Sequence, residues 1–300
     1  MSDLTLQNMS VRQLVAFGDA ALLSGSPEMA AQLYRSAIRE AGAKTPLSVH
    51  SRHGLARNPN RRTQPTLSAL QALQKVDEGV FIGDGIATWL KSPPFADDAR
   101  YMELADKHCH LLPLANWHWN LQTVVWAVQH ARSVKGEFVE LGVFRGHTTL
   151  FTAEYVGFET WDKTWSLYDT FEGIPADQID PGWEEGNKAA YGGTFSYEEV
   201  RDRFAAFPNI KVIKGRVPEV LAEDCPDAIS FIHMDLNNTI AEIQALDALY
   251  ERLSPGGVIV FDDYGWSVAR RQREAEDKWM ADRGMKILPL PTGQGLFIKP

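Results

Sequence analysis

The spacing of apolar residues changes character near residue 135 of this 300-residue chain. Beyond that point, short apolar runs alternate with segments of helical spacing, at 136–142, 164–171, 209–215, 228–235 and 256–265. This alternation predicts an α/β fold, with a mostly parallel sheet and helices on both faces. The stretches MKILPL and GLFIKP add a hairpin-like pair at the end of the chain. Seven strands in this arrangement indicate a Rossmann-like, doubly wound fold.

The first part of the chain has helical spacing instead. Residues 11–25 and 27–42 predict two helices, with Ser26 as N-cap of the second and Pro27 at its first position. The pair resembles one tetratricopeptide hairpin, but no second copy follows, so we interpret 1–50 as a helical appendage for packing or dimerisation. The rest of the predicted organisation is a linker or loop over 51–66, a helical region over 67–135 and the α/β domain over 136–300.

Composition excludes several classes of partner. The net charge is −9 and no block of Lys or Arg is present, so nucleic acid is not an expected partner. Cys109 and Cys225 are the only cysteines, which predicts no disulfide framework or zinc site and fits the cytoplasm. The start of the sequence does not resemble a signal peptide, and no apolar run approaches 18 residues, so no membrane span is expected.

Acidic residues end the first two predicted strands. Glu140 ends the first, and Gly142 and Gly146 follow it with the spacing G-x-x-x-G, which differs from the G-x-G-x-x-G of dinucleotide sites. We expect Gly142 to let the backbone approach a ligand. Asp169 ends the second strand, where it can accept hydrogen bonds from ribose hydroxyls or simply organise a turn. Together they favour a nucleoside without phosphate, such as S-adenosylmethionine.

Three further carboxylates follow the fourth and fifth predicted strands. Asp235 ends one strand, and Asp262 and Asp263 end the next. Because parallel strands end at one edge of a sheet, the three should converge, and like charges so close would repel unless they were protonated or bound a metal. An oxygen-rich site of this kind suits Mg²⁺. The alternative is that one aspartate of the pair caps a helix and the other is solvated.

The chain from about 110 to 300 resembles the TylF/MycF-type (macrocin O-methyltransferase-like) class I methyltransferases. The matching stretches are FVELGVFRGHTT, YDTFEGIP, GTFSYEEVRDRF, NIKVIKGRVPEVL, IHMD and LYERLSPGGVIVFDDYG. The resemblance implies S-adenosylmethionine as methyl donor, Mg²⁺ held by Asp235, Asp262 and Asp263, and methylation of a hydroxyl, typically on a sugar of a natural product. The residues expected to bind the donor are Glu140, Gly142, Phe144, Gly146, Asp169, Thr170, Gly215, Arg216 and Asp235. One departure is Asn237, where family members often carry a second aspartate.

Removal of the hydroxyl proton needs a base. Asp235 is the first choice because it lies between the expected metal and donor sites. His233 is the second, since it lies two residues earlier in the same strand and shares a face with Asp235, although a hydrogen-bonded core histidine is the more common role. His147 is either a helix-start residue or a neighbour of the donor carboxylate. The stretch HCH at 108–110 is interpreted as structural.

Other residues are candidates for the walls of the acceptor pocket. The long connection over 176–194 has the composition of a lid, with Trp183 and Tyr191 as covers for a ring or as anchors. The aromatic stretch 116–122 and the pair Thr292 and Gln294 are weaker candidates for the acceptor side.

The leading hypothesis is therefore an O-methyltransferase that depends on S-adenosylmethionine and Mg²⁺ and acts on a hydroxyl of a sugar or other natural-product acceptor. We also expect a homo-oligomer. Two alternatives stay open at this stage. An NAD(P)-linked oxidoreductase would share the fold and the use of Asp169, and a catalytically inactive scaffold protein would keep the fold without binding the donor or the metal.

Overall fold

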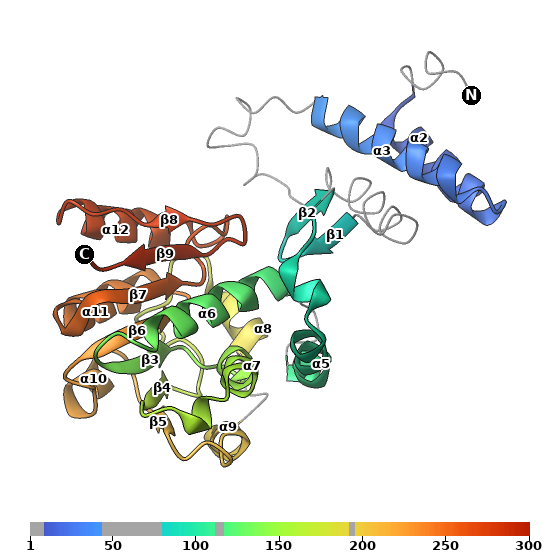
Figure 1. The fold of residues 1–300 in the computed structure, drawn as a ribbon. Helices are drawn as coiled ribbons and strands as arrows, with labels where there is room; N and C mark the ends of the chain where they lie inside the picture. Colours follow the sequence, from blue (N-terminus) through green and yellow to red (C-terminus); the bar gives the residue numbers. More distant parts are fainter. Residues whose placement is uncertain (1–8, 44–79, 90, 112–116, 192–195) are drawn as a thin grey trace. The chain divides into compact units, whose positions relative to one another are not determined.

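The computed structural model describes residues 9–43, 80–89, 91–111, 117–191 and 196–300 (Figure 1). The chain divides into two compact units, Met1–Pro94 and Phe95–Pro300. The predicted linker over 51–66 lies outside the described residues. No helix within the described part is long and apolar enough to cross a membrane.

Two helices, α2 (Val11–Leu23) and α3 (Pro27–Ala43), pack against each other in the first unit. Ser10 caps α2 by accepting a hydrogen bond from the backbone of Gln13, whose side chain in turn accepts from the Ser10 backbone. A Cβ on Gly18 would lie 2.4 Å from the ring of Tyr34, so the glycine allows the two helices to approach closely. The Tyr34 hydroxyl donates to Asp19 at 2.8 Å.

A short antiparallel hairpin, β1 (Val80–Gly83) and β2 (Ile86–Trp89), also lies in this unit. It corrects the expectation of a helical region over 67–135 at residues 80–89. The connecting Asp84 and Gly85 both have positive φ, 53° and 65°. Asp-Gly is a favoured sequence for the two-residue turn of a hairpin, so the signal was present in the sequence.

The second unit is a seven-stranded sheet with helices on both faces, as the sequence predicts (Figure 1). The strand order is β5-β4-β3-β6-β7-β9-β8. Strands β3 to β7 are parallel, and β9 is antiparallel to both of its neighbours. The strands are β3 (Glu137–Leu141), β4 (Trp165–Asp169), β5 (Ile210–Lys214), β6 (Ile229–Met234), β7 (Leu253–Phe261), β8 (Leu288–Pro289) and β9 (Gly295–Ile298). The α-helices are α5 (Ala99–His108), α6 (His118–Ala131), α7 (His147–Val156), α8 (Glu184–Tyr191), α9 (Tyr197–Arg203), α10 (Glu219–Glu223), α11 (Thr239–Leu249) and α12 (Arg270–Ala281).

Each face of the sheet has its own apolar core. Along β3, Phe138 packs with residues of α6, α7 and α9, whereas Val139 and Leu141 pack with residues of α10, α11 and α12. Side chains of a strand alternate between the two faces, which places Glu140 on the Phe138 side. Because both faces are covered, the strands read as nearly continuous apolar runs in the sequence.

The strand register sets the positions of the acidic residues. Glu140 lies directly beside His233 of β6, which lies beside Val260 of β7. One residue beyond the strands, the backbone N–H of Asp235 donates to Leu141 and that of Asp262 donates to Met234. The aspartates therefore follow the last paired positions and meet at the carboxyl edge of the sheet, where ligands of open α/β sheets bind.

Candidate functional site

A cavity of about 460 Å³ opens at this edge of the sheet. Its walls come from the segments that follow β3, β4, β5, β6 and β7, together with Trp117, Trp183 and Tyr191. Of the residues predicted to bind the donor, those that line it are Glu140, Gly142, Phe144, Asp169, Thr170, Gly215 and Asp235. The carboxylates predicted to bind the metal line the same cavity.

The structure brings Asp235, Asp262 and Asp263 together. One oxygen from each lies within 4.8 Å of the others, and all three side chains are partly buried. Burial and the charges of Asp262 and Asp263 raise the pKa of Asp235. Burial, then Asp262 and Glu276, raise the pKa of Asp263 to about 8. Oδ2 of Asp263 is buried without a hydrogen-bond partner. A set of carboxylate oxygens with unbalanced charge and an unsatisfied oxygen fits a hard divalent cation such as Mg²⁺.

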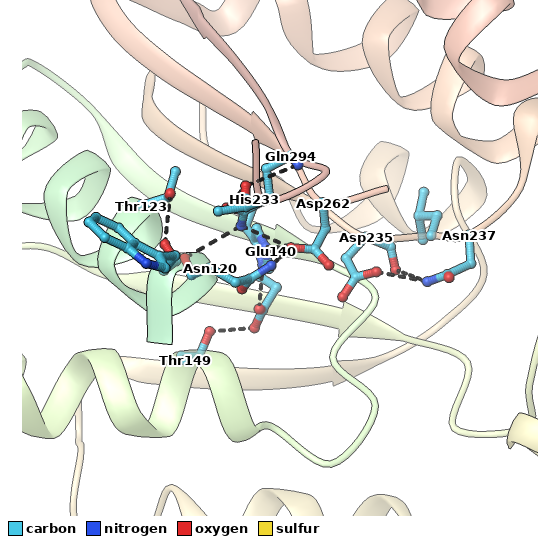
Figure 2. A network of polar contacts seen from close by, with 12 residues as sticks. Asn120, Thr123, Glu140, Thr149, His233, Asp235, Asn237, Asp262 and Gln294 are labelled. Atoms are coloured by element: carbon cyan, nitrogen blue, oxygen red, sulfur yellow. Dashed lines mark hydrogen bonds and ion pairs between the residues drawn. The ribbon is translucent and has the colours of Figure 1, made fainter. Parts of the chain in front are cut away.

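Asp262 differs from its two neighbours because polar side chains hold it. Its Oδ1 accepts hydrogen bonds from Asn120 Nδ2 at 2.9 Å and from Gln294 Nε2 at 3.0 Å (Figure 2). His233 Nε2 lies 3.5 Å from the same oxygen. Burial would raise the pKa of Asp262, but the contacts with His233, Asn120 and Gln294 outweigh it and lower that pKa. Asp262 is therefore the carboxylate of the three that stays ionised most readily.

Glu140 is hydrogen-bonded to His233 and also reaches the cavity wall (Figure 2). Its Oε1 lies 2.8 Å from His233 Nδ1, and its Oε2 accepts a hydrogen bond from the Thr149 hydroxyl. Glu140 is only 2% exposed and His233 only 1%. Burial lowers the pKa of His233, but its contacts with Asp262 and Glu140 outweigh burial and raise it well above 6.5. His233 is not among the described residues that line the cavity, so the geometry does not favour it as the base.

Asp169 organises the turn that follows β3. Its Oδ2 accepts hydrogen bonds from the backbone N–H groups of Val143 and Phe144, at 2.7 and 2.8 Å. Its Oδ1 accepts from the backbone N–H of Phe171 at 2.7 Å. Asp169 therefore organises a turn, which was one of its two predicted roles. It also lines the cavity, where it could contact a ribose as in the other role.

Both glycines of the G-x-x-x-G stretch leave room for other parts of the protein. A Cβ on Gly142, whose φ is +85°, would lie 1.9 Å from the carbonyl oxygen of Asp235. Gly142 therefore allows the ends of β3 and β6 to approach, and it lines the cavity as well, so its expected approach to a ligand stays a prediction. A Cβ on Gly146 would lie 2.8 Å from the ring of Phe204, and Gly146 does not line the cavity.

Arg216 is also misplaced for a donor contact. Its guanidinium pairs with Asp177 at 2.6 Å and with Glu219 at 3.5 Å, and it does not line the cavity. Its neighbour Gly215 does line it, as predicted. Gly215 and Arg216 both follow β5, but the side chain of Arg216 points to Asp177 and away from the cavity.

Two residues on the cavity wall have strained backbones. Phe144 and Asn237 have φ values of 49° and 58°, which are uncommon for residues with a Cβ and tend to occur at functional sites. The amide nitrogen of Asn237 donates to Asp235 Oδ1 at 2.7 Å (Figure 2). Asn237 thus acts here as a hydrogen-bond donor to a candidate metal ligand.

The weaker candidates divide between the cavity and the core. His147 is buried at the start of α7 and lines the cavity, and burial, then His108 and His110, lower its pKa to about 4. The HCH stretch does not line the cavity, and His108 pairs with Glu154 at 3.1 Å.

The loop over 176–194 contains α8, and both of its large aromatic residues, Trp183 and Tyr191, line the cavity. Trp117 lines it from the opposite segment, in edge contact with Trp266 at 5.7 Å between ring centroids. Thr292 and Gln294 do not line it, which corrects their assignment to the acceptor side.

Sequence reasoning missed two groups of residues. Asn120 lies on α6 within the stretch 116–122 and lines the cavity, but its contact with Asp262, 142 residues later, was not predicted. Glu242 of α11 and Glu276 of α12 are completely buried near the metal candidates, where burial raises the pKa of both. Glu242 Oε1 accepts from the backbone N–H of Leu236, the residue after Asp235. A signal for Glu242 existed, since it stands among apolar residues in TIAEIQAL.

The chain is similar to known proteins over most of its second unit. The family model described as Macrocin-O-methyltransferase (TylF) matches residues 117–289. The chain is 29% identical over 161 residues to the 8-demethyl-8-(2,3-dimethoxy-alpha-L-rhamnosyl)-tetracenomycin-C 4'-O-methyltransferase of Streptomyces olivaceus, covering 50% of this chain and 61% of that protein. It is 26% identical over 142 residues to the mycinamicin III 3''-O-methyltransferase of Micromonospora griseorubida, covering 44% and 56%. The chain thus spans less than two thirds of the length of these curated relatives.

Solved structures share the fold. The O-methyltransferase NovP superposes with a TM-score of 0.53 at 21% identity, over 60% of this chain and 79% of that one. At this identity the similarity concerns the fold alone.

Proposed function

Since the chain belongs to the TylF family of macrocin O-methyltransferases, we propose that it transfers a methyl group from S-adenosylmethionine to a hydroxyl of a sugar-containing natural-product acceptor. The observation that carries the proposal is the convergence of Asp235, Asp262 and Asp263 in the same cavity as the candidate donor residues. The relatives are named as methyltransferases of glycosylated or similar natural products.

The donor is assigned to the side of the cavity formed after β3, β4 and β5. Asp169 offers its carboxylate there, and Phe144, Thr170 and Gly215 supply the wall. The methyl group of S-adenosylmethionine is bound to a sulfonium, and its transfer releases the neutral thioether S-adenosylhomocysteine, an excellent leaving group. The protein therefore has mainly to hold the acceptor oxygen in line with that methyl group and to exclude water. Trp183 and Tyr191 are suited to exclude water because both line the cavity.

The acceptor is assigned to the side with the candidate metal ligands. Trp117 precedes α6, whose Asn120 contacts Asp262, and Trp266 donates its backbone N–H to the backbone carbonyl of Asp263. Both indoles line the cavity, so they offer apolar faces for a ring close to the carboxylates. Mg²⁺ held by Asp235, Asp262 and Asp263 would stabilise negative charge on the acceptor oxygen.

Asp235 is the residue that we assign as general base. It follows β6, between the donor side and Asp262, and lines the cavity. Its Oδ1 accepts the hydrogen bond of Asn237, which leaves Oδ2 with the greater capacity to take the hydroxyl proton. His233 is the weaker alternative because both of its ring nitrogens face carboxylates.

Two measurements test the proposal. Tryptophan fluorescence titration with S-adenosylhomocysteine and with NAD separates a methyltransferase from an oxidoreductase, and we expect binding of the first only. A screen of glycosylated natural products and sugar nucleotides with labelled donor, with Mg²⁺ or with EDTA, then tests transfer. We expect turnover that EDTA abolishes. Turnover undiminished by EDTA would exclude the metal role, and failure to bind S-adenosylhomocysteine would exclude the function.

A paired variant localises the effect. Asp262→Ala combined with Asp263→Ala should abolish turnover while binding of S-adenosylhomocysteine largely survives. The matched control is Asp202→Ala, because this aspartate is exposed and pairs only with the neighbouring Arg201 in the contacts described. The cytoplasmic location and the homo-oligomeric state stay predictions, for which fractionation and light scattering are the tests.

A further inference from the structure

We propose that Glu140 is a positioning residue that acts through His233 on the metal ligand Asp262, and that it does not bind the methyl donor. The inference rests on the metal site of the proposed function. It reverses the assignment that the sequence suggests for an acidic residue at the end of the first strand of such a sheet.

Both oxygens of Glu140 are already engaged inside the protein. Oε1 contacts His233 Nδ1 at 2.8 Å, and Oε2 accepts from Thr149. The side chain is 3% exposed, although it reaches the cavity wall. The free lone pairs of these oxygens are therefore poorly accessible to a donor amino or hydroxyl group. Asp169, at the end of the neighbouring strand, also accepts backbone hydrogen bonds on both oxygens, but it is less buried than Glu140 and so more accessible for that role.

His233 of β6 lies between two carboxylates, Glu140 of β3 and Asp262 after β7. The register places it directly beside Glu140, and its side chain is only 1% exposed. Nδ1 contacts Glu140 Oε1 at 2.8 Å, and Nε2 lies 3.5 Å from Asp262 Oδ1, an ion-pair distance without a hydrogen bond. A ring held by a carboxylate at Nδ1 has a fixed orientation at Nε2, as is typical of the outer partners of metal ligands.

The contacts of Asp262 converge on a single oxygen. His233, Asn120 and Gln294 all approach Oδ1 (Figure 2). The hydroxyl of Thr292 donates to Gln294 Oε1, which turns the amide nitrogen of Gln294 toward Asp262. With Oδ1 held in this way, Oδ2 is the oxygen presented to a cation. The network therefore fixes the orientation of one ligand before the metal binds, which preorganises the site.

The experiment compares Glu140→Gln with Asp169→Asn in the full-length protein. Calorimetry gives the Kd for Mn²⁺ and Mg²⁺, and tryptophan fluorescence gives the Kd for S-adenosylhomocysteine. For Glu140→Gln we expect about a tenfold or greater loss of ion affinity, the usual effect of removing an outer partner of a ligand, with S-adenosylhomocysteine affinity within about twofold of wild type. For Asp169→Asn we expect the reverse. A selective loss of S-adenosylhomocysteine affinity in Glu140→Gln overturns the inference.

A second set of variants tests the route through His233. If Glu140 acts through that ring, Glu140→Gln combined with His233→Gln should lose no more ion affinity than His233→Gln alone, whereas additive losses would contradict the link. Asn120 contacts Asp262 independently of His233, so Asn120→Ala should also weaken ion binding selectively. This variant keeps the test available if Glu140→Gln folds poorly. Equal losses of ion and S-adenosylhomocysteine affinity in these variants would indicate a general structural role and overturn the proposal. Wild-type protein that binds S-adenosylhomocysteine but neither ion would instead show that the metal site itself is wrong.

Discussion

Replacing Gly142 with alanine tests how closely the ends of β3 and β6 must approach. The new Cβ would lie 1.9 Å from the carbonyl oxygen of Asp235 and 2.6 Å from its carbonyl carbon. These are backbone atoms of the neighbouring segment, so no side-chain rotation can relieve the overlap. The substitution therefore has to separate the two strand ends or distort the backbone around Asp235.

The expected loss of stability has two parts. Alanine at the φ of +85° that Gly142 adopts costs about 1–2 kcal/mol relative to glycine. Forcing extra volume into a close-packed position costs about 1–3 kcal/mol. Together they predict a decrease of about 2–5 kcal/mol in the free energy of unfolding. Because Asp235 is a candidate metal ligand, Mg²⁺ affinity should fall as well.

Gly284 provides the matched control. Its φ is +72°, and a Cβ there would meet nothing within 4 Å, so Gly284→Ala carries only the backbone part, about 1–2 kcal/mol. Urea unfolding of both variants and the wild type, followed by far-UV circular dichroism, measures the difference. If Gly142→Ala were no less stable than Gly284→Ala, the close approach of the strand ends would not be the reason for the glycine.

Three further predictions concern single charges. Because the pKa of Asp263 is raised to about 8, the metal-free folded protein retains a proton that the unfolded chain releases, so its stability falls as pH rises from 5 to 8. Asp263→Asn should remove this fall. Urea unfolding in EDTA should show the variant gaining about 3–4 kcal/mol over wild type across that range, from about 1.36 kcal/mol per pH unit. Burial raises the pKa of Glu276 too, so Glu276→Gln should raise the melting temperature at pH 8 and change it little at pH 4, and an equal change at both pH values would refute this. Arg216→Ala should leave the affinity for S-adenosylhomocysteine unchanged, because the arginine faces Asp177 outside the cavity, and a tenfold loss in a fluorescence titration would restore it to the donor site.

The sheet and its acidic edge were predictable because each signal is local. Runs such as FVELG and FIHMD combine an apolar strand with an acidic residue at its end, and parallel strands bring those ends to one edge. The convergence of Asp235, Asp262 and Asp263 follows from these two facts alone. The family resemblance adds the chemistry but is not needed for the geometry.

The partners of those carboxylates could not be predicted in the same way. Asn120 comes from a helix far earlier in the chain, and the amide of Gln294 from the turn before the last strand. Their contacts with Asp262 depend on how a helix and a β-hairpin pack on the sheet, which no local pattern encodes. Gly142 shows a related limit, since a glycine that serves a ligand and a glycine that serves a neighbouring strand look identical in sequence.

Buried charged residues in helices were also difficult to predict. Glu242 and Glu276 belong to helices, where glutamate is ordinarily a surface residue, yet both are completely buried. In the hairpin at 80–89, the Asp84-Gly85 turn signal was present, but the helical spacing of apolar residues around it favoured a helix. Direct attention to charged residues among apolar neighbours, and to every Asp-Gly pair, would have recovered Glu242 and the hairpin.

The arrangement around Asp262 has a consequence for how the protein matures. One oxygen of this carboxylate holds together α6 and the turn before β9, so residues 120 and 294 must both be in place before the ligand is oriented. A chain that stops before residue 294 would carry all three aspartates and still lack one of the two amides that orient Asp262. An ordered place for the ion then arises only after the segment around residue 294 has been synthesised and has folded beside α6.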